Sequence, residues 1–190
     1  MPVKPALSKL LTEMAEPKQV EFRLLRPHVA LPSYATEQSA CFDIQACLQT
    51  GMNIMSWSSK NEPCEYLLKE DRCLIQPGER YLIPTGWAVR CPTGYSLRLY
   101  SRSGLSLKSG LMLVNGVGII DADYRHEVCM LLTNISRCAA WIENGMRVCQ
   151  GEFAPMAVGF STFQPIERSV TDEEWFTTQR TGGFGSTGVK

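Results

Sequence analysis

Two carboxylates near the middle of the chain, Asp121 and Asp123, are the residues best suited by type and spacing to do chemistry. They flank one alanine, follow the apolar and partly β-branched run 117–120, and precede Tyr124. Such a run is typical of a buried strand, and a carboxylate just past it is held in fixed geometry while still reaching a cavity. The alternative is an Asx-type turn, in which both aspartates accept hydrogen bonds from backbone N–H groups. Taken alone, the stretch favours the turn.

Two other segments carry groups that bind phosphate. The sequence Ser-Arg-Ser-Gly at 101–104 offers backbone N–H groups, two hydroxyls and a guanidinium, which are the donors that phosphate oxygens accept. The glycine-rich segment 182–188 adds backbone donors, the hydroxyls of Ser186 and Thr187, and the flat ring of Phe184. Neither segment has the arrangement of a P-loop. A glycine-rich tail by itself is more often a disordered terminus.

A further candidate is Asp43, which stands between the apolar residues Phe42 and Ile44. A charge in an apolar setting is normally paired, hydrogen-bonded or functional, because burying it unpaired costs too much free energy. We therefore expect Asp43 to have a partner or a task.

These candidates need a scaffold, and the turn signals indicate one built from strands. Gly/Pro turns at 84–86 and 92–94 separate short apolar runs, and the Asn-Gly pair at 144–145 is a hairpin signal. Short strands with turns about every ten residues indicate an all-β sandwich or barrel. We expect a polar turn at 101–104, a loop at 56–63, and strands at 19–25, 66–75 (interrupted at 69–72), 81–83, 87–91, 95–100, 111–114, 117–120, 127–133, 138–142 and 146–153.

Composition excludes several classes of function. Lys+Arg and Asp+Glu both number 19, so the net charge is zero and gives no general attraction to nucleic acid or an anionic membrane. The eight cysteines form no C-x-x-C pair and the two histidines are far apart, so zinc-ligand spacing is absent. With no apolar run long enough to span a membrane and no secretory signal, we expect a soluble cytoplasmic protein with reduced thiols.

Five segments, taken together and in order, resemble the five motifs of the trimeric deoxyuridine triphosphate nucleotidohydrolases, the dUTPases. They are 39–46, 100–104, 115–128, 145–150 and 180–188. The resemblance covers about residues 20–188. It implies an all-β, jelly-roll-like subunit and a homotrimer with three active sites at subunit interfaces. It also implies hydrolysis of dUTP to dUMP and pyrophosphate with Mg²⁺ on the triphosphate, which limits uracil incorporation into DNA and supplies dUMP for thymidylate synthesis.

The resemblance assigns roles to the residues of the central segment. Asp121 would be the general base that activates water for attack on the α-phosphorus. Tyr124 would pack against the deoxyribose, and Asn115 would pair with the uracil edge. The backbone near Ile119, Ile120 and Cys129 would assist this recognition, and Asp123 is left as a turn-stabilising carboxylate.

It assigns the triphosphate to the other segments. Arg102, Ser103 and Gly104 would hold the α- and β-phosphates, with Asp43 acting on the metal through water and Gln150 positioning water or phosphate. From the tail, Phe184 would stack on the uracil, and the remaining γ-phosphate contacts would come from Arg180, Gly185, Ser186 and Thr187. Mg²⁺ needs no protein cage, because it keeps waters and phosphate oxygens as ligands.

The sequence departs from the family pattern in three places. Cys41 stands where the first motif usually has glycine, and the last motif is one residue shorter than usual after Arg180. The stretch 47–76 is longer than the family needs, so we infer an inserted hairpin or loop there. The expected organisation is a helical extension at 1–18, whose apolar stripe recurs at helical spacing, a β domain at 19–178 and a closing arm at 179–190.

Two competing functions remain open. One is a sister activity on the same fold, dCTP deamination or a bifunctional enzyme. The other is a nucleotide-gated binding protein that contacts a partner through the 47–76 insertion or the N-terminal helix.

Overall fold

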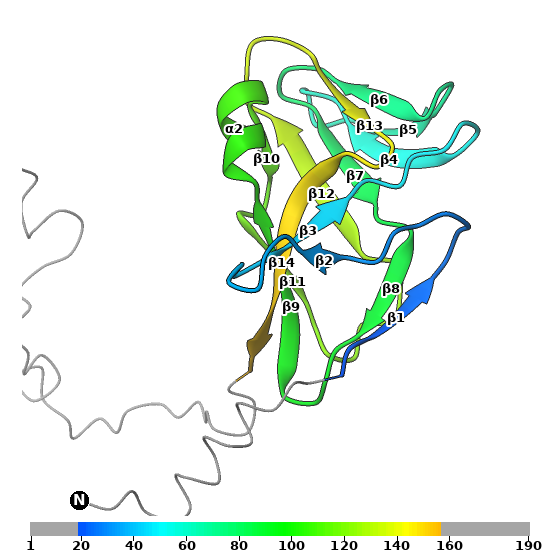
Figure 1. The fold of residues 1–190 in the computed structure, drawn as a ribbon. Helices are drawn as coiled ribbons and strands as arrows, with labels where there is room; N and C mark the ends of the chain where they lie inside the picture. The colour runs from blue at the N-terminus through cyan, green and yellow to red at the C-terminus, as the bar shows by residue number, and fades with distance from the viewer. Residues whose placement is uncertain (1–18, 157–190) are drawn as a thin grey trace, which may run out of the picture. The chain divides into compact units, whose positions relative to one another are not determined.

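The computed structural model describes residues 19–156, which form a mostly β fold with one short helix in that range (Figure 1). The expected helix at 1–18 and arm at 179–190 lie outside the described residues. The elements are β1 (Glu21–Leu24), β2 (Ser33–Tyr34), β3 (Phe42–Gln45), β4 (Asn53–Trp57), β5 (Pro63–Leu67), β6 (Arg72–Ile75), β7 (Arg80–Pro84), β8 (Trp87–Arg90), β9 (Tyr95–Ser101), α2 (Ser103–Ser109), β10 (Leu111–Leu113), β11 (Val117–Ile120), β12 (Cys129–Asn134), β13 (Ala140–Glu143) and β14 (Arg147–Pro155).

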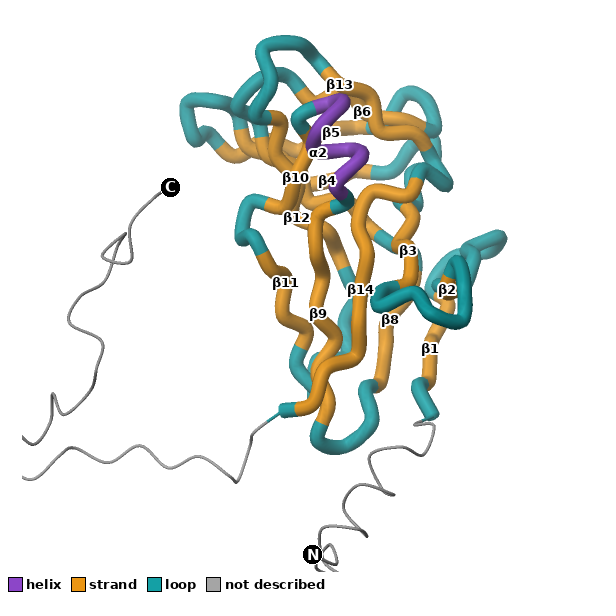
Figure 2. Tube along the Cα trace, turned by 60° about the vertical axis from the view of Figure 1, so that its left-hand side comes forward, coloured by secondary structure: helices purple, strands orange, loops and turns teal. Residues whose placement is uncertain are grey.

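Two five-stranded antiparallel sheets form the body of the fold (Figure 2). One has the strand order β10-β12-β7-β4-β5, and the other has β11-β9-β14-β3-β2. The pairs β1-β8 and β13-β6 complete the described strands. The all-β prediction is confirmed in this coarse form.

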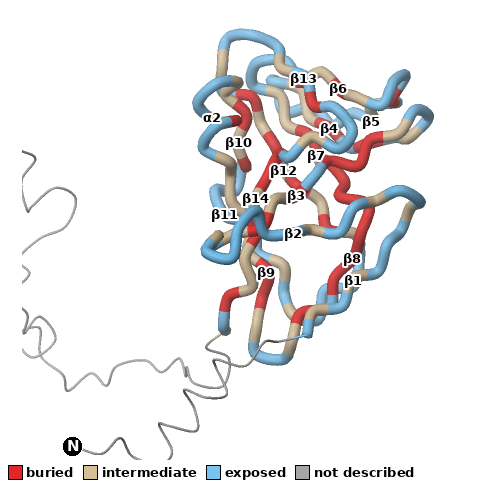
Figure 3. The backbone as a smooth tube through the Cα atoms, viewed as in Figure 1, coloured by how far each residue is buried: buried red, intermediate tan, exposed pale blue. Residues whose placement is uncertain are grey.

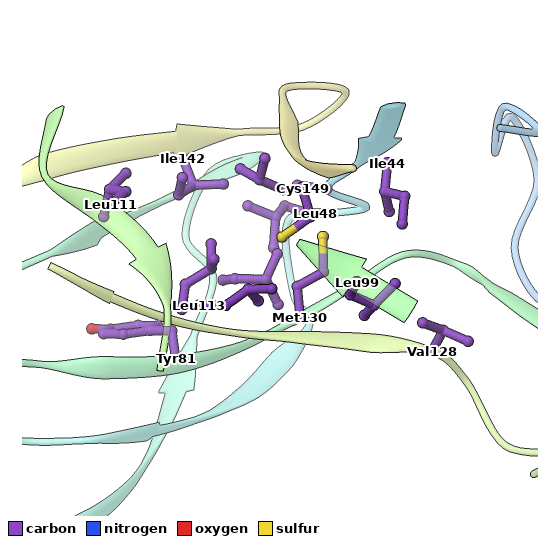
Figure 4. Close-up of a cluster of buried hydrophobic side chains, with 14 of the residues drawn as sticks. Ile44, Leu48, Tyr81, Leu99, Leu111, Leu113, Val128, Met130, Ile142 and Cys149 are labelled. Atoms are coloured by element: carbon purple, nitrogen blue, oxygen red, sulfur yellow. The ribbon is translucent and has the colours of Figure 1, made fainter. Parts of the chain in front are cut away.

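The core lies between the two five-stranded sheets, because their strands alternate buried and more exposed residues. In β12 the alternation is complete, with Met130, Leu132 and Asn134 buried. Figure 4 shows side chains from both sheets meeting, among them Ile44 and Leu99 from one and Met130 from the other. Most buried positions lie along the strands, and most of the connecting loops are exposed (Figure 3). This packing fixes the strand register, on which the site depends.

The helix α2 replaces the polar turn expected at 101–104. The helix gives no periodic apolar pattern, because it has only 7 residues and Leu105 is the only one of them that is buried. Its end is defined by Gly110, which has a φ of 67° and donates its N–H to the carbonyl of Ser106. A Cβ at this position would lie 2.6 Å from the Cβ of Ser136, so both the backbone conformation and the packing require glycine.

The segment 47–76 contains the β4–β5 hairpin, and its being an insertion relative to the family stays a prediction. The strand expected at 66–75 is instead two strands, because β5 pairs with β4 whereas β6 pairs with β13. The charged residues 69–71 lie between them. Among the described residues, no helix is long and apolar enough to cross a membrane.

All eight cysteines are free, as expected for reduced thiols. Cys47, Cys73, Cys91 and Cys149 are buried and Cys129 is half-buried, where a thiol packs as a small apolar side chain.

Candidate active site

A cleft of about 580 Å³ lies beside α2 and brings together the five residues predicted to hold the triphosphate and metal from the described part of the chain. These residues are Asp43, Arg102, Ser103, Gly104 and Gln150. Lys108 and Arg147, which the prediction omitted, also line the cleft. Its lining therefore carries three cations and one carboxylate, a net positive charge suited to a polyanion.

Strand register explains why these distant residues meet. Asp43 on β3 lies opposite Gln150 on β14, and Cys149 on β14 lies opposite Ser101 on β9. Arg102 follows directly at the end of β9. The Gln150 side chain donates to the carbonyl of Ser101 at 3.1 Å and so joins the two strands again.

A bulge in β14 explains why Arg147 was missed. The register between β14 and β3 shifts between Arg147 and Cys149, and two consecutive residues, Val148 and Cys149, are buried there. In a regular strand, residues three apart point to opposite faces, whereas one extra residue restores them to the same side. Arg147 and Gln150 therefore both line the cleft. The adjacent apolar residues Val148 and Cys149 are the sequence signal for this bulge.

The Asp43 carboxylate binds two guanidinium groups, which confirms that this charge is paired. Its Oδ1 lies 2.8 Å from Arg102 Nε, and its Oδ2 lies 3.1 Å from Arg147 Nη1. Arg102 Nη1 also donates to the carbonyl of Arg147 at 2.8 Å. Arg102 is thus held at two points, and a guanidinium with five N–H donors keeps others for a ligand.

Gly104 leaves open space beside the ion-paired Asp43 and Arg102. A Cβ built on Gly104 would meet no atom of the chain within 4 Å, and its φ is not in the left-handed region. Neither packing nor backbone strain therefore requires glycine here. The Ser103 and Gly104 N–H groups lie in the first turn of α2, where no helical carbonyl can accept them. The Ser101 hydroxyl, in contrast, accepts the N–H of Leu113 at 2.9 Å and has a structural task.

The residues predicted to recognise the nucleoside lie on a different part of the surface. Asn115 is exposed in the turn between β10 and β11, while Asp121 and Tyr124 are exposed after β11. Ile119, on β11, is 63% exposed although it is apolar. Tyr124 donates its hydroxyl to the carbonyl of Glu127 at 3.0 Å.

The expected Asx-type turn is not formed by side chains. A backbone bond from the Tyr124 N–H to the Asp121 carbonyl, 3.1 Å long, closes the turn. Within residues 19–156, neither the Asp121 nor the Asp123 carboxylate accepts a hydrogen bond. Asp121 is therefore free to act on a ligand, and the turn-stabilising role expected of Asp123 is wrong for its side chain.

Glu127 holds the C-terminal end of the segment 115–129 in place. Its Oε2 accepts a hydrogen bond from Arg26 Nη2 at 2.8 Å, and its Oε1 accepts the N–H of Gly86 at 2.7 Å. This bond to Glu127 raises the pKa of Arg26. Cys129 follows, and burial raises the pKa of its thiol to about 12, so the thiol stays protonated and offers a ligand only weak hydrogen bonding.

Within one chain, the residues predicted to recognise the nucleoside lie far from those that line the phosphate cleft. β11 runs antiparallel to β9, with Val117 opposite Tyr100 and Ile120 opposite Leu97. Asp121 therefore lies at the opposite end of β9 from Arg102 (Figure 2). Five to six residues of extended strand separate them, which is about 17–20 Å. Asp121 and Arg102 of the same chain cannot contact one phosphate group.

Metal binding by protein ligands alone is not supported in the described range. No group of three or more His, Cys, Asp or Glu side chains gathers within residues 19–156. The single carboxylate of the cleft, Asp43, lies among phosphate-binding donors. This donor set fits a Mg²⁺ ion held mainly by phosphate oxygens and water. The predicted contacts of Arg180, Phe184, Gly185, Ser186 and Thr187 lie outside the described residues.

Comparisons with known proteins agree on one family. The family model described as dUTPase matches residues 67–188. The deoxyuridine 5'-triphosphate nucleotidohydrolase of Desulfotalea psychrophila is 39% identical over 176 residues, covering 90% of this chain and 99% of that protein.

Solved structures have the same fold. A mutant of the Staphylococcus bacteriophage 80alpha dUTPase, solved with dUpNHpp, has a TM-score of 0.65 at 21% identity and covers 91% of this chain and 100% of its own. A mutant dUTPase of phage phi11 of S. aureus, solved to show the coordination of a structural Mg(II) ion, has a TM-score of 0.59 at 19% identity, covering 82% and 99%. With the family model matching well over half of the residues and a curated relative matching nearly end to end, the chain belongs to the dUTPase family.

Proposed function

We propose that this chain hydrolyses dUTP to dUMP and pyrophosphate by attack of water on the α-phosphorus. Membership of the dUTPase family makes it a dUTP nucleotidohydrolase. The observation that carries the site assignment is the cleft itself. A fixed Arg102, unused N–H donors and the open space at Gly104 lie together there, where a phosphate chain needs them. We expect the enzyme in the cytoplasm, or in the host cytoplasm if its source is a virus.

Arg102, Ser103 and Gly104 bind the α- and β-phosphates. The Asp43 carboxylate holds Arg102 in place, so the guanidinium does not have to be ordered when substrate arrives. Fixed donors of this kind stabilise charge that develops on the phosphoryl oxygens during the reaction. Gln150, tied to the carbonyl of Ser101, positions water or phosphate beside them.

Asp121 is the general base. Its carboxylate takes a proton from water while the water oxygen forms a bond to the α-phosphorus. The bond from that phosphorus to the bridging oxygen breaks, and pyrophosphate leaves with the electron pair. Tyr124 packs against the deoxyribose, and Asn115 pairs with the uracil edge, which allows strong rejection of other bases. The backbone of Ile119, Ile120 and Cys129 lies alongside.

Asp43 would act through water on a Mg²⁺ ion bound to the triphosphate. When bound, the ion neutralises charge on the phosphate oxygens. Phe184 from the C-terminal arm stacks on the uracil, while Gly185, Ser186 and Thr187 bind the γ-phosphate, and Arg180 contributes there if the shorter motif allows it.

The active site is shared between copies of a jelly-roll-like subunit in a homotrimer. The separation of about 17–20 Å between Asp121 and Arg102, set by strand rise along β9, supports this proposal. A site that needs both residues at one phosphate must take Asp121 from one copy and Arg102 from another. The exposed, apolar Ile119 beside Asp121 fits a surface that another copy covers.

A substrate comparison tests the activity. Purified full-length protein with Mg²⁺ should release pyrophosphate from dUTP and little from dTTP, dCTP or UTP. Intact dUTP after prolonged incubation contradicts the proposal. Ammonia release from dCTP would instead assign the sister activity.

A mixing experiment tests the shared site. Asp121→Asn and Arg102→Ala are each expected to be inactive alone. Refolded together in equal amounts, they should regain about a quarter of wild-type activity, because random assembly places an intact Asp121 opposite an intact Arg102 in that share of sites. A mixture as inactive as its components would show that one chain supplies both groups.

A further inference from the structure

We propose that Lys108 binds the part of the triphosphate that leaves as pyrophosphate. This inference rests on the proposed function, because it extends the phosphate site by one residue for which no role was expected. Lys108 lines the same cleft as Asp43, Arg102 and Arg147.

Lys108 differs from the other two cations of the cleft in having no partner among residues 19–156. Arg102 and Arg147 both pair with the Asp43 carboxylate, at 2.8 and 3.1 Å. Within residues 19–156, the Lys108 ammonium makes no hydrogen bond or ion pair. One carboxylate therefore offsets part of the charge of two guanidinium groups, and Lys108 adds a cation that no acidic side chain of residues 19–156 pairs with.

The position of Lys108 on α2 relates it to the phosphate contacts. It follows Gly104 by four residues, so both lie on one face of the helix, about 6 Å apart along the axis. Helical side chains lean toward the N-terminus, which directs the lysine stem back toward Gly104. The space beside Gly104 is open, since a Cβ there would meet nothing within 4 Å.

This geometry selects the phosphate group that Lys108 meets. Arg102, Ser103 and Gly104 are assigned to the α- and β-phosphates, and Lys108 lies one turn further along the helix. Since those three residues are assigned to the α- and β-phosphates, the phosphate group left for the Lys108 ammonium in the same cleft is the γ-phosphate and its bridge to the β-phosphate. A compact charge on a flexible stem suits a group that must be bound and then released.

A structural role for Lys108 would give a different result. A lysine in the last turn of a helix interacts favourably with the unpaired carbonyls there. That role affects the stability of α2 and leaves the affinity for pyrophosphate unchanged. Measurements of stability and of pyrophosphate affinity on the same variants therefore separate the two.

The test compares Lys108→Gln with Lys108→Arg and with the control variant Lys60→Gln. Lys60 is an exposed residue of the β4–β5 turn, so this control removes the same charge at a site away from the cleft. For Lys108→Gln we expect KM for dUTP and the inhibition constant of pyrophosphate to rise about tenfold, the worth of one partly screened charged hydrogen bond. The inhibition constant of dUMP should stay unchanged, Lys108→Arg should restore most of the affinity, and Lys60→Gln should behave as wild type.

Calorimetric titration of the full-length proteins with magnesium pyrophosphate makes the test independent of turnover. If the wild-type protein fails to hydrolyse dUTP, the proposed function is lost, yet weaker pyrophosphate binding by Lys108→Gln still supports the inference. Equal pyrophosphate affinity in wild type and Lys108→Gln overturns it, as does a wild-type protein that binds no pyrophosphate.

Discussion

The phosphate cleft and the segment 115–129 differ in how much of their chemistry one chain completes. In the cleft, Asp43, Arg102 and Arg147 are already joined by ion pairs and by a hydrogen bond from the Arg102 side chain to the Arg147 carbonyl. In the segment, Asn115 and Asp121 are exposed, and neither side chain makes a hydrogen bond within the described residues.

This difference follows from what surrounds each region. The cleft lies where three adjacent strands of one sheet and the start of α2 meet, so its side chains find partners within the chain. The segment 115–129 includes β11, an edge strand of the same sheet, and exposes its polar side chains beyond it. One half of the proposed site is therefore preassembled within the chain, and the other half is the part that the proposed shared site would complete with a second copy and a substrate.

The largest expected effect comes from the unpaired carboxylate. Asp121→Asn should reduce turnover of dUTP by about 10²–10⁴-fold, the contribution typical of a general base, while dUTP binding measured by titration is retained. The matched control is Asp123→Asn, which changes an equally unpaired carboxylate two residues away and should stay within about threefold of wild type. Equal losses in both variants would show that the charge of the turn matters and not one base.

The paired carboxylate should affect both activity and stability. Asp43→Asn leaves Arg102 and Arg147 without their shared anion, so turnover should fall by about 100-fold and the free energy of unfolding by about 1 kcal/mol. Chemical denaturation measures the second quantity. Glu21→Gln breaks the exposed pair with Arg90 and should change stability by less than about 0.5 kcal/mol. An Asp43→Asn protein as active as wild type would contradict preassembly by ion pairing.

Each region contains a glycine whose replacement by alanine should have a different effect. Gly104→Ala should raise the free energy of unfolding by about 0.5 kcal/mol, because the methyl group meets nothing and alanine favours the helix. It should also raise KM for dUTP by about tenfold, since the methyl group occupies space kept for phosphate. Gly118→Ala on β11 should instead destabilise by about 1–3 kcal/mol, because its Cβ would lie 3.1 Å from that of Leu99. Unchanged KM in Gly104→Ala would remove the argument for a ligand there.

The smallest expected effect is the pH dependence of stability that two thiols near these regions, those of Cys149 and Cys129, produce. Burial raises the pKa of Cys149, under the cleft, and of Cys129, at the start of β12, from 9.0 to about 12. A raised folded-state pKa stabilises the fold fully below pH 9, and this stabilisation is lost as the pH rises from 9 to 12. The midpoint of urea unfolding should therefore fall over that range, less steeply in Cys149→Ala than in Cys64→Ser, whose thiol is exposed. If the urea midpoint falls equally steeply with pH in both variants, the pKa of the Cys149 thiol does not change on unfolding.

Much of the fold was predictable because its signals are local. Alternating apolar residues and Gly/Pro turns indicated β7, β8 and β9, and the hydrophobic run before Asp121 indicated β11. The helix α2 was not predictable from periodicity, since a single residue, Leu105, is buried along its length. The split of 66–75 between two sheets was hidden as well, because strand pairing is decided by partners distant in the sequence.

The sequence by itself determined the family motifs, the candidate residues and the β class, since each is written in residue types at short spacing. Only the tertiary structure decided that Asp43 pairs with Arg102 and Arg147, and that a bulge brings Arg147 to the same side as Gln150. It alone decided that Lys108 lines the cleft without a partner among residues 19–156. It also decided that Asp121 lies at the far end of β9 from Arg102. These are consequences of strand register and sheet order, which long-range packing fixes and no local pattern encodes.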